Sequence, residues 1–275
     1  MTTFSDMVYA LGGVPCVGLQ PVGVKNYRKV DPSPLNKDEQ TYRTITQAIA
    51  ASVAGDVILI APGSYDETVT VNKAKLTLIG LGGRGSVFIE ATTAGAEAME
   101  VTVDDVTLVN VGCDGDDTSS YALKLTSAAR FRAYGCKIEG SDTALLLLSA
   151  AGDAIFTDCE FAWGVNGVVC AAGGPDPSTQ IVFKNCRFHN ISTVHITDGA
   201  NTFANLQLID CVFDAAEDGT EPTDYLTIDT AGTSGIVTGC RFATATNATG
   251  VLTIAADVQW VANMTEAGVS TARPS

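Results

Sequence analysis

Apolar and polar residues alternate in short runs along most of this chain, and turn-forming residues separate the runs. The stretch "DVILIAPGSYDETVTVNKAKLTLIGLGG" at residues 56–83 is typical: Pro-Gly, Asn-Lys and Gly-Gly pairs divide it into short alternating segments. Alternation with a period of two predicts half-buried strands, and these pairs predict turns. We therefore expect an all-β body built from many short strands.

One segment ahead of these strands has a helical period instead. Its apolar residues recur at helical spacing: Ile45, Ala48, Ile49 and Val53. Thr44 and Gln47 form a capping-box pattern, and Gly55 is a suitable C-terminal stop. The pattern predicts a short amphipathic cap helix over residues 44–54.

A repeat dominates the chain beyond residue 100. Cysteines return at intervals of 23, 23, 27, 25 and 29 residues, at Cys113, Cys136, Cys159, Cys186, Cys211 and Cys240. Four of them are followed two residues later by phenylalanine, at Phe161, Phe188, Phe213 and Phe242. By its spacing, Met264 is expected to replace the next cysteine. Self-similarity at this period is typical of solenoids. In a parallel β-helix, both residues of each Cys-x-Phe unit would face inward and stack from coil to coil.

The cysteines have three readings. Zinc needs four converging ligands, which a linear row does not supply. Disulfides within the row are disfavoured because stacked Cβ atoms stay near the strand spacing. We therefore interpret the row as buried structural thiols. Cys16 and Cys170 lie outside the row, and Cys16 is the candidate for an interchain bridge.

Charge divides the chain into two regions. Residues 1–43 hold five basic and four acidic groups, and the remainder holds 11 and 27, which gives net charges of +1 and −16. A total of −15 argues against nucleic acid as a partner. The chain has no long apolar run for a membrane span and no convincing signal peptide.

The breaker-rich first 40 residues predict an extended N-terminal arm, and residues 41–275 the β-helix domain. An arm of this kind becomes ordered by lying on something else. Its apolar and basic residues would supply the partner contacts: Leu11, Val14, Cys16, Val17, Leu19, Val22, Lys25, Arg28 and Lys29.

The stretch "YRTITQAIAASVAGDVILIAPGSYDETVTVNKAKLTLIGLG" resembles the opening of pectin-lyase-like right-handed β-helices, pectinesterases in particular. The resemblance implies a single right-handed parallel β-helix, which we expect to have about nine coils. It implies little about activity, because inert surface and virion proteins share this opening.

The esterase set of that family is incomplete here. In "GSDTALL", Asp142 and Thr143 match the family's pattern, but Ser141 replaces its glutamine. Asn166 stands where the family has its nucleophilic aspartate, and an amide cannot serve in that role. The family's Gly-Arg-Pro-Trp stretch has no match, and no calcium site for a lyase is evident. We expect no enzymatic activity and no cofactor. If the chain is an enzyme, the carboxylates to test are Asp142, Asp153 and Asp158.

Other candidate groups have plainer interpretations. Asp114, Asp116 and Asp117 are weak candidates for binding a cation, and a solvated loop is the plainer reading. For His189 and His195 we expect surface or turn positions rather than catalysis. Three aromatic residues are candidates for an exposed glycan-binding face: Trp163, Tyr225 and Trp260.

Three classes of function remain open. The first is a structural virion protein of a tailed bacteriophage: a capsid decoration (cement) protein, made in the host cytoplasm, homotrimeric, and bound through its arm to the major capsid protein or another virion protein. The second is a glycan- or receptor-binding tail spike or fibre. The third is a polysaccharide esterase or lyase.

Overall fold

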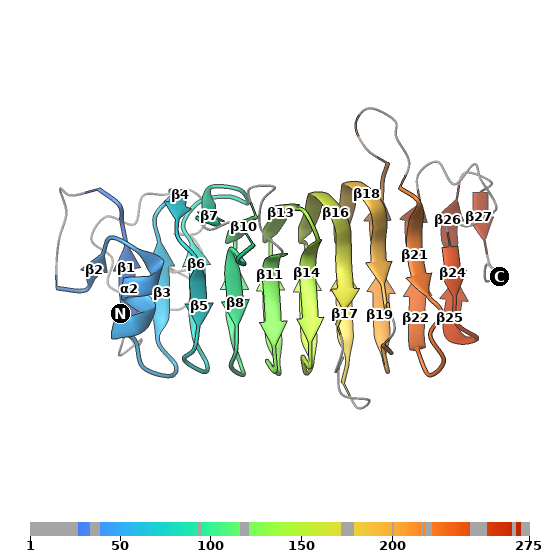
Figure 1. The fold of residues 1–275 in the computed structure, drawn as a ribbon, viewed down its shortest axis with the longest axis horizontal. Helices are drawn as coiled ribbons and strands as arrows, with labels where there is room; N and C mark the ends of the chain where they lie inside the picture. Colours follow the sequence, from blue (N-terminus) through green and yellow to red (C-terminus); the bar gives the residue numbers. More distant parts are fainter. Residues whose placement is uncertain are drawn as a thin grey trace, which may run out of the picture.

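The chain forms an elongated solenoid of parallel strands, seen in a computed structural model (Figure 1). The structure describes residues 27–33, 39–92, 95–115, 121–171, 179–199, 201–215, 217, 222–242, 252–265 and 268–270. Within these residues the single helix is α2, Ile45–Ala51. The expected all-β parallel β-helix is therefore confirmed.

One face of the solenoid is an 11-stranded sheet. In spatial order its strands are β2 (Thr41–Tyr42), β1 (Tyr27–Val30), β3 (Val57–Ile60), β6 (Thr77–Gly80), β9 (Thr107–Val109), β12 (Phe131–Tyr134), β15 (Ala154–Thr157), β17 (Ile181–Lys184), β19 (Leu206–Ile209), β22 (Ser234–Thr238) and β25 (Asp257–Val261).

The 16-stranded sheet covers the other two sides of the coils. Its main path contains β4 (Gly63–Asp66), β7 (Val87–Glu90), β10 (Gly112–Asp114), β13 (Lys137–Ser141), β16 (Glu160–Cys170), β18 (Arg187–Thr197), β20 (Val212–Phe213), β23 (Arg241–Phe242), β26 (Asn263–Thr265) and β27 (Gly268–Ser270). A branch contains β5 (Val69–Val71), β8 (Met99–Val101), β11 (Tyr121–Thr126), β14 (Ala144–Ser149), β21 (Asp224–Ile228) and β24 (Leu252–Ile254). The long strands β16 and β18 pair with both the path and the branch.

The predicted phenylalanine row is confirmed. Phe161, Phe188, Phe213 and Phe242 are register partners in successive coils. Their rings stack in parallel, with centroids 4.7, 4.9 and 4.7 Å apart along the row. All four are buried, so the row lies in the core. Offset stacking at this separation is favourable beyond the burial itself.

The thiol row is one cysteine shorter than predicted. Cys113 pairs with Ile138, the residue two places after Cys136, and therefore stands in the phenylalanine row. Buried Val111 lies two residues earlier, level with Cys136. Equal chain spacing misled the prediction because register, not residue count, decides which side chains stack.

At the other end of the row, Met264 was also misplaced. It pairs with Arg241 and is 50% exposed. In the next coil, the position that continues the thiol row after Cys240 is occupied by buried Asn263. The Asn263 Oδ1 accepts from the Cys240 N–H at 2.9 Å. Its Nδ2 donates to the Val237 carbonyl at 2.9 Å. An amide thus ends the thiol row by satisfying backbone groups of the last coils.

The seven cysteines among the described residues are all buried and free. Five of the thiols donate to backbone carbonyls: Cys136, Cys159, Cys186, Cys211 and Cys240. The Cys211 Sγ, for example, lies 3.3 Å from the Phe183 carbonyl oxygen. Burial raises the pKa of Cys113 to about 12. The interpretation as structural thiols is confirmed for these residues, whereas Cys16 lies outside them.

The backbone turns a corner directly before each cysteine of the thiol row, and the residue at that corner has a left-handed conformation. The preceding residues have φ of 52° to 65°, and they are Gly135, Asp158, Asn185, Asp210 and Gly239. Glycine, asparagine and aspartate tolerate this conformation best. A Cβ on Gly135 would lie 2.5 Å from the Asn110 Oδ1, so the side chain of one coil occupies the space that glycine leaves in the next. The sequence carried this signal immediately before each ladder cysteine.

The helix α2 covers the N-terminal end, packed against β1, β2, β3 and β5. Thr44 accepts from the Gln47 N–H as predicted, at 3.1 Å. The helix ends at Ala51 with Ser52 as its cap, before the expected Gly55. Glu67 accepts from the N–H groups of Ile45 and Thr46 at 2.7 and 2.9 Å and so satisfies the exposed first turn.

Part of the predicted arm belongs to the body. Tyr27–Val30 forms β1, which pairs in parallel with β2 and β3. Arg28 donates to the Ala51 carbonyl at 3.0 Å and lies 3.5 Å from the Asp56 carboxylate. Lys29 lies over the Tyr27 ring. A strand places Arg28 and Lys29 in the sheet rather than in an arm, and their predicted partner contacts stay a prediction. The other predicted arm residues lie outside the described residues: Leu11, Val14, Cys16, Val17, Leu19, Val22 and Lys25.

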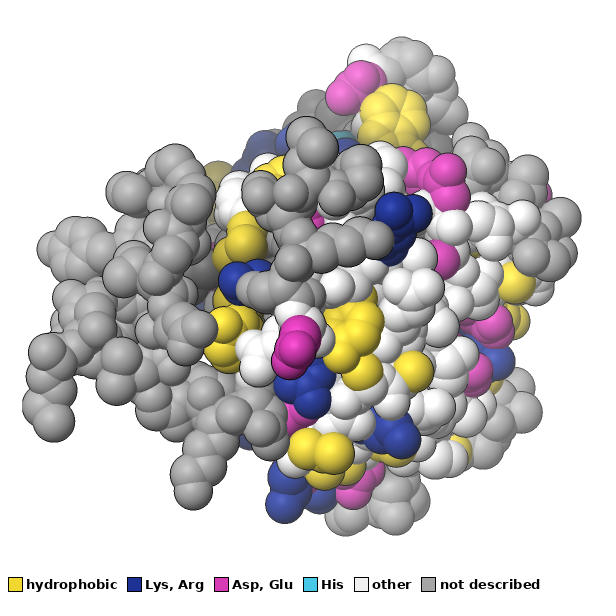
Figure 2. All heavy atoms as spheres, turned by 90° about the vertical axis from the view of Figure 1, so that its left-hand side faces the viewer, with side chains coloured by type: hydrophobic (Ala, Val, Ile, Leu, Met, Phe, Trp, Pro, Cys, Tyr) yellow, Lys and Arg dark blue, Asp and Glu magenta, His cyan; other side chains and the backbone are white. Residues whose placement is uncertain are grey.

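Figure 2 looks onto this N-terminal end. Hydrophobic and basic side chains of the described residues lie next to one another on it.

Candidate functional site

The three carboxylates proposed for catalysis lie at three different turns. Asp142 follows β13, Asp153 precedes β15 and Asp158 follows β15. The length of β15 separates Asp153 from Asp158 by about 16 Å at the usual rise per residue. Asp153 accepts from the Gln180 N–H at 2.8 Å, and Asp158 accepts from the Asn185 amide. Asp153 and Asp158 thus hold turns together, and the strand between them keeps them too far apart for an acid–base pair.

The resemblance to pectinesterases aligns Asp142 with the family's first aspartate and Asn166 with its nucleophilic aspartate. The Asn166 Nδ2 donates to the Thr143 carbonyl at 2.7 Å, which places the amide beside the Asp142 turn in the adjacent coil. Asn166 therefore lies beside the turn that contains Asp142. The nucleophile's place is held by an amide that is bonded to backbone, so this corner lacks the second carboxylate of an esterase.

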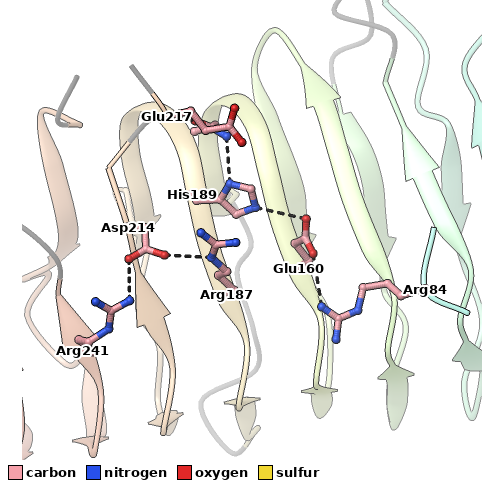
Figure 3. Close-up of polar contacts among 8 residues, drawn as sticks. Arg84, Glu160, Arg187, His189, Asp214, Glu217 and Arg241 are labelled. Atoms are coloured by element: carbon pink, nitrogen blue, oxygen red, sulfur yellow. Dashed lines mark hydrogen bonds and ion pairs between the residues drawn. The ribbon is translucent and has the colours of Figure 1, made fainter. Parts of the chain in front are cut away.

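A charged network runs across the outer side of the main path (Figure 3). The Arg84 guanidinium lies 3.3 Å from the Glu160 carboxylate, whose other oxygen lies 3.2 Å from the His189 Nε2. The His189 Nδ1 is 3.0 Å from the Asn190 Nδ2. The Asn190 Oδ1 accepts from the Glu217 N–H at 2.6 Å.

A second group of charges lies beside this network. Asp214 accepts from the Arg187 Nε at 2.9 Å and from the Arg241 Nη2 at 3.0 Å (Figure 3). Both arginines are about half exposed, at 53% and 51%, so these pairs contribute little stability. Sequence reasoning missed both groups, because their members come from different coils.

Burial opposes ionisation of Glu160, but the hydrogen bond from His189 and the charges of His189, Lys137 and Arg84 outweigh it. The pKa of Glu160 is therefore held below its usual value. Its ionised form anchors the imidazole.

The expected surface or turn positions of the histidines are wrong. Both lie within β18, with His189 6% exposed and His195 fully buried. His195 packs against Phe188, Phe213 and Tyr225, and neither ring nitrogen has a hydrogen-bond partner. Burial lowers the pKa of His195 to about 3, so the ring is neutral at physiological pH. An enclosed neutral imidazole of this kind is part of the core.

Of the three aromatic residues considered for glycan binding, two are core residues. Tyr225 is fully buried and Trp260 is 7% exposed, stacked on Phe242. Trp163 is 48% exposed and has a φ of 58°. A bulky residue in the left-handed region is uncommon, and such outliers concentrate at functional sites.

The acidic loop candidate is only partly within the described residues. Asp114 lies in β10, whereas Asp116 and Asp117 fall outside the described ranges. Across the described ranges, no three His, Cys, Asp or Glu residues are grouped so that they could hold a metal ion. The same ranges contain no helix that is both long and apolar enough to cross a membrane.

Comparison with known proteins defines the class of this solenoid. Residues 56–217 match the family model described as "Right handed beta helix region". The chain belongs to this right-handed β-helix family. No curated protein sequence matches it.

Solved structures of two kinds resemble the fold. The pectin methylesterase PemA from Erwinia chrysanthemi is 18% identical over 80% of this chain and 79% of its own, with a TM-score of 0.54. Rice weevil pectin methyl esterase is 14% identical over 97% and 96%, with a TM-score of 0.61. ORF18 of Geobacillus virus E2 is 15% identical over 87% of this chain and 60% of its own, with a TM-score of 0.62. These low identities establish a shared fold and leave activity open.

Proposed function

We propose that this chain is a non-enzymatic structural protein of a tailed-phage virion that decorates the capsid as a cement protein. The observation that carries the proposal is the Asn166 amide, which the resemblance to pectinesterases aligns with the family's nucleophilic carboxylate and which here donates to the Thr143 carbonyl. Asp142, Asp153 and Asp158 lie at separate turns and do not supply a replacement pair. The similarity to a viral open-reading-frame product supports the viral setting.

Assembly is assigned to the segment ahead of β1. The strand β1 belongs to the sheet, so the proposed attachment arm shortens to residues 1–26. Its apolar residues and Lys25 would bind a neighbouring copy in a homotrimer or the major capsid protein. A stiff solenoid suits this role because the backbone hydrogen bonds of each coil are made to its neighbours.

Particles that lack this chain test the proposal. Purified full-length protein should bind them, and a version starting at Tyr27 should not. Equal binding by both versions would remove the arm from the proposal. Turnover of methyl-esterified pectin that disappears in Asp142→Asn would replace it with the esterase alternative.

Glycan recognition is the second candidate function, and exposed Trp163 favours it. Aromatic faces offer stacking surfaces, and the left-handed backbone of Trp163 lies within β16. On a glycan array, Trp163→Ala should abolish binding. Tyr134→Ala is the matched control, since Tyr134 is 39% exposed on the other sheet. An array on which the unmodified protein binds nothing removes this candidate.

A further inference from the structure

The orientation of His189 follows from a chain of hydrogen bonds that begins at a backbone amide. The Glu217 N–H can only donate, so the Asn190 oxygen faces it, at 2.6 Å. The Asn190 NH₂ group therefore faces the His189 Nδ1, at 3.0 Å. Because that group also only donates, Nδ1 must be the acceptor. The proton of the neutral ring is then on Nε2, which donates to Glu160 at 3.2 Å.

The charges around this ring favour a second proton, whereas the hydrogen bonds oppose it. Ionisable groups lie around His189 on several elements (Figure 3). Glu160 on β16 contacts the ring and is paired with Arg84 in the turn between β6 and β7. The others are Arg187 and His195 on β18, and Asp214 and Glu217 in the next coil. Glu160 directly contacts the ring and stabilises an imidazolium. Arg187 is paired with Asp214. The Asn190 NH₂ group already faces Nδ1 as a donor, so a second N–H on Nδ1 would have no acceptor.

We propose that His189, Asn190 and the Glu217 amide form an acid-sensitive hydrogen-bond switch. Protonation places a second N–H on Nδ1, opposite the NH₂ group of Asn190. Asn190 must then turn its amide so that Oδ1 accepts from the imidazolium. The same turn points NH₂ at the Glu217 N–H, and that hydrogen bond breaks.

The switch goes beyond the proposed virion role and does not depend on it. It couples the protonation of a buried side chain in β18 to the backbone of the following coil. Asn190 and Glu217 are 27 positions apart in the chain, so their hydrogen bond is a contact between coils.

Amide hydrogen exchange of Glu217, read by NMR and corrected for intrinsic rates, tests the switch. Protection of this amide should fall about tenfold between about pH 7.5 and 5, the effect of losing one hydrogen bond. Protection that is equal at the two pH values would overturn the proposal.

Asn190→Asp should abolish the acid-induced loss of protection at the Glu217 amide. The new side chain keeps the shape and tolerates the φ of 54°, but it offers two acceptors. One carboxylate oxygen accepts from Glu217, and the other accepts from the protonated Nδ1. Protection at Glu217 should therefore persist at about pH 5. Acid release in this variant equal to that of the unmodified protein would contradict the assignment.

Two further measurements separate the switch from general acid unfolding. His195→Phe removes the other buried imidazole and should leave the response at Glu217 intact; loss of the response would assign it to His195. In the unmodified protein, ¹⁵N NMR at about pH 7.5 should show the His189 proton on Nε2. The opposite tautomer would overturn the proposal even if Asn190→Asp fails to fold.

Discussion

The two halves of the solenoid place different side chains at the same strand positions. The inner row contains Tyr65, Ile89, Cys113 and Ile138 in the N-terminal coils, and it continues as stacked Phe161, Phe188, Phe213 and Phe242. On the outer face, the N-terminal coils stack four carboxylates in register: Asp66, Glu90, Asp114 and Glu139. The C-terminal coils instead bring opposite charges together around Glu160 and Asp214.

The parallel backbone decides which residues become neighbours, and the side chains decide whether that proximity stabilises the fold. Stacked rings gain from repetition because each ring has two favourable neighbours. Stacked carboxylates repel one another, and salt screens that repulsion. We therefore expect the C-terminal rows to be the more sensitive to truncation and the N-terminal outer row to be the more sensitive to ionic strength.

Truncation of the aromatic row should have the largest effect. Phe188→Ala removes stacking on both Phe161 and Phe213 and should lower the free energy of unfolding by about 3–5 kcal/mol. Ile89→Ala, in the same row, should cost about 1–2 kcal/mol less because it removes no aromatic pair. Urea denaturation of the two variants measures the difference. Equal losses would mean that ring stacking adds nothing beyond burial.

Acid should weaken the aromatic half through His195. The folded pKa of His195 is about 3 and lies below the ordinary value near 6.5. The full contribution of the neutral ring to the free energy of unfolding is therefore present above about pH 6.5. It declines as pH falls towards 3, by about 1.4 kcal/mol per pH unit. Between about pH 6.5 and 5, His195→Phe should therefore lose about 2 kcal/mol less unfolding free energy than the unmodified protein. Parallel pH profiles from denaturation would refute this role.

The left-handed corners should respond less strongly. Gly135→Ala combines a φ of 60° with a Cβ only 2.5 Å from the Asn110 Oδ1, and we expect a loss of about 2 kcal/mol. Gly55→Ala is the control, since its φ is 91° but no atom lies within 4 Å of the added Cβ. It should cost about 1 kcal/mol. Thermal unfolding that ranks the control as the more harmful would argue against close packing between corner residues.

The outer carboxylate row should give the smallest effect. Glu90→Gln removes the charge between Asp66 and Asp114, so it should stabilise the fold by about 0.3 kcal/mol at low ionic strength. In high salt the gain should vanish because the repulsion is already screened. Stabilisation that is the same in both conditions would point to a cause other than charge.

The sequence predicted those features that repeat at fixed positions within each coil. Phe188 and Phe213 were assigned to one inner row because each follows a cysteine at the same interval. Cys113 was placed in the wrong row because the spacing of cysteines along the chain does not show which residues pair. Cys113 pairs with Ile138, so Val111 and not Cys113 is level with Cys136. The Gly, Asp or Asn residue directly before each cysteine of the row is a sequence signal for the left-handed corners.

The charged network was beyond a single sequence. The His189–Glu160 contact joins residues 29 apart, and the Arg84–Glu160 contact joins residues 76 apart. No local period relates them, since they meet only when the coils close and bring turns and strands to one side. The exposure of Trp163 and the burial of Tyr225 likewise depend on which side of its coil each residue lies.

The proposed function requires that residues 1–26 join copies of this β-helix. Native mass spectrometry of the full-length chain beside a version starting at Tyr27 tests it most directly, in reducing buffer so that Cys16 cannot bridge copies. We expect a trimer for the full-length chain and a folded monomer for the shortened one. Two monomers, or two trimers, would contradict the claim that these residues assemble the protein.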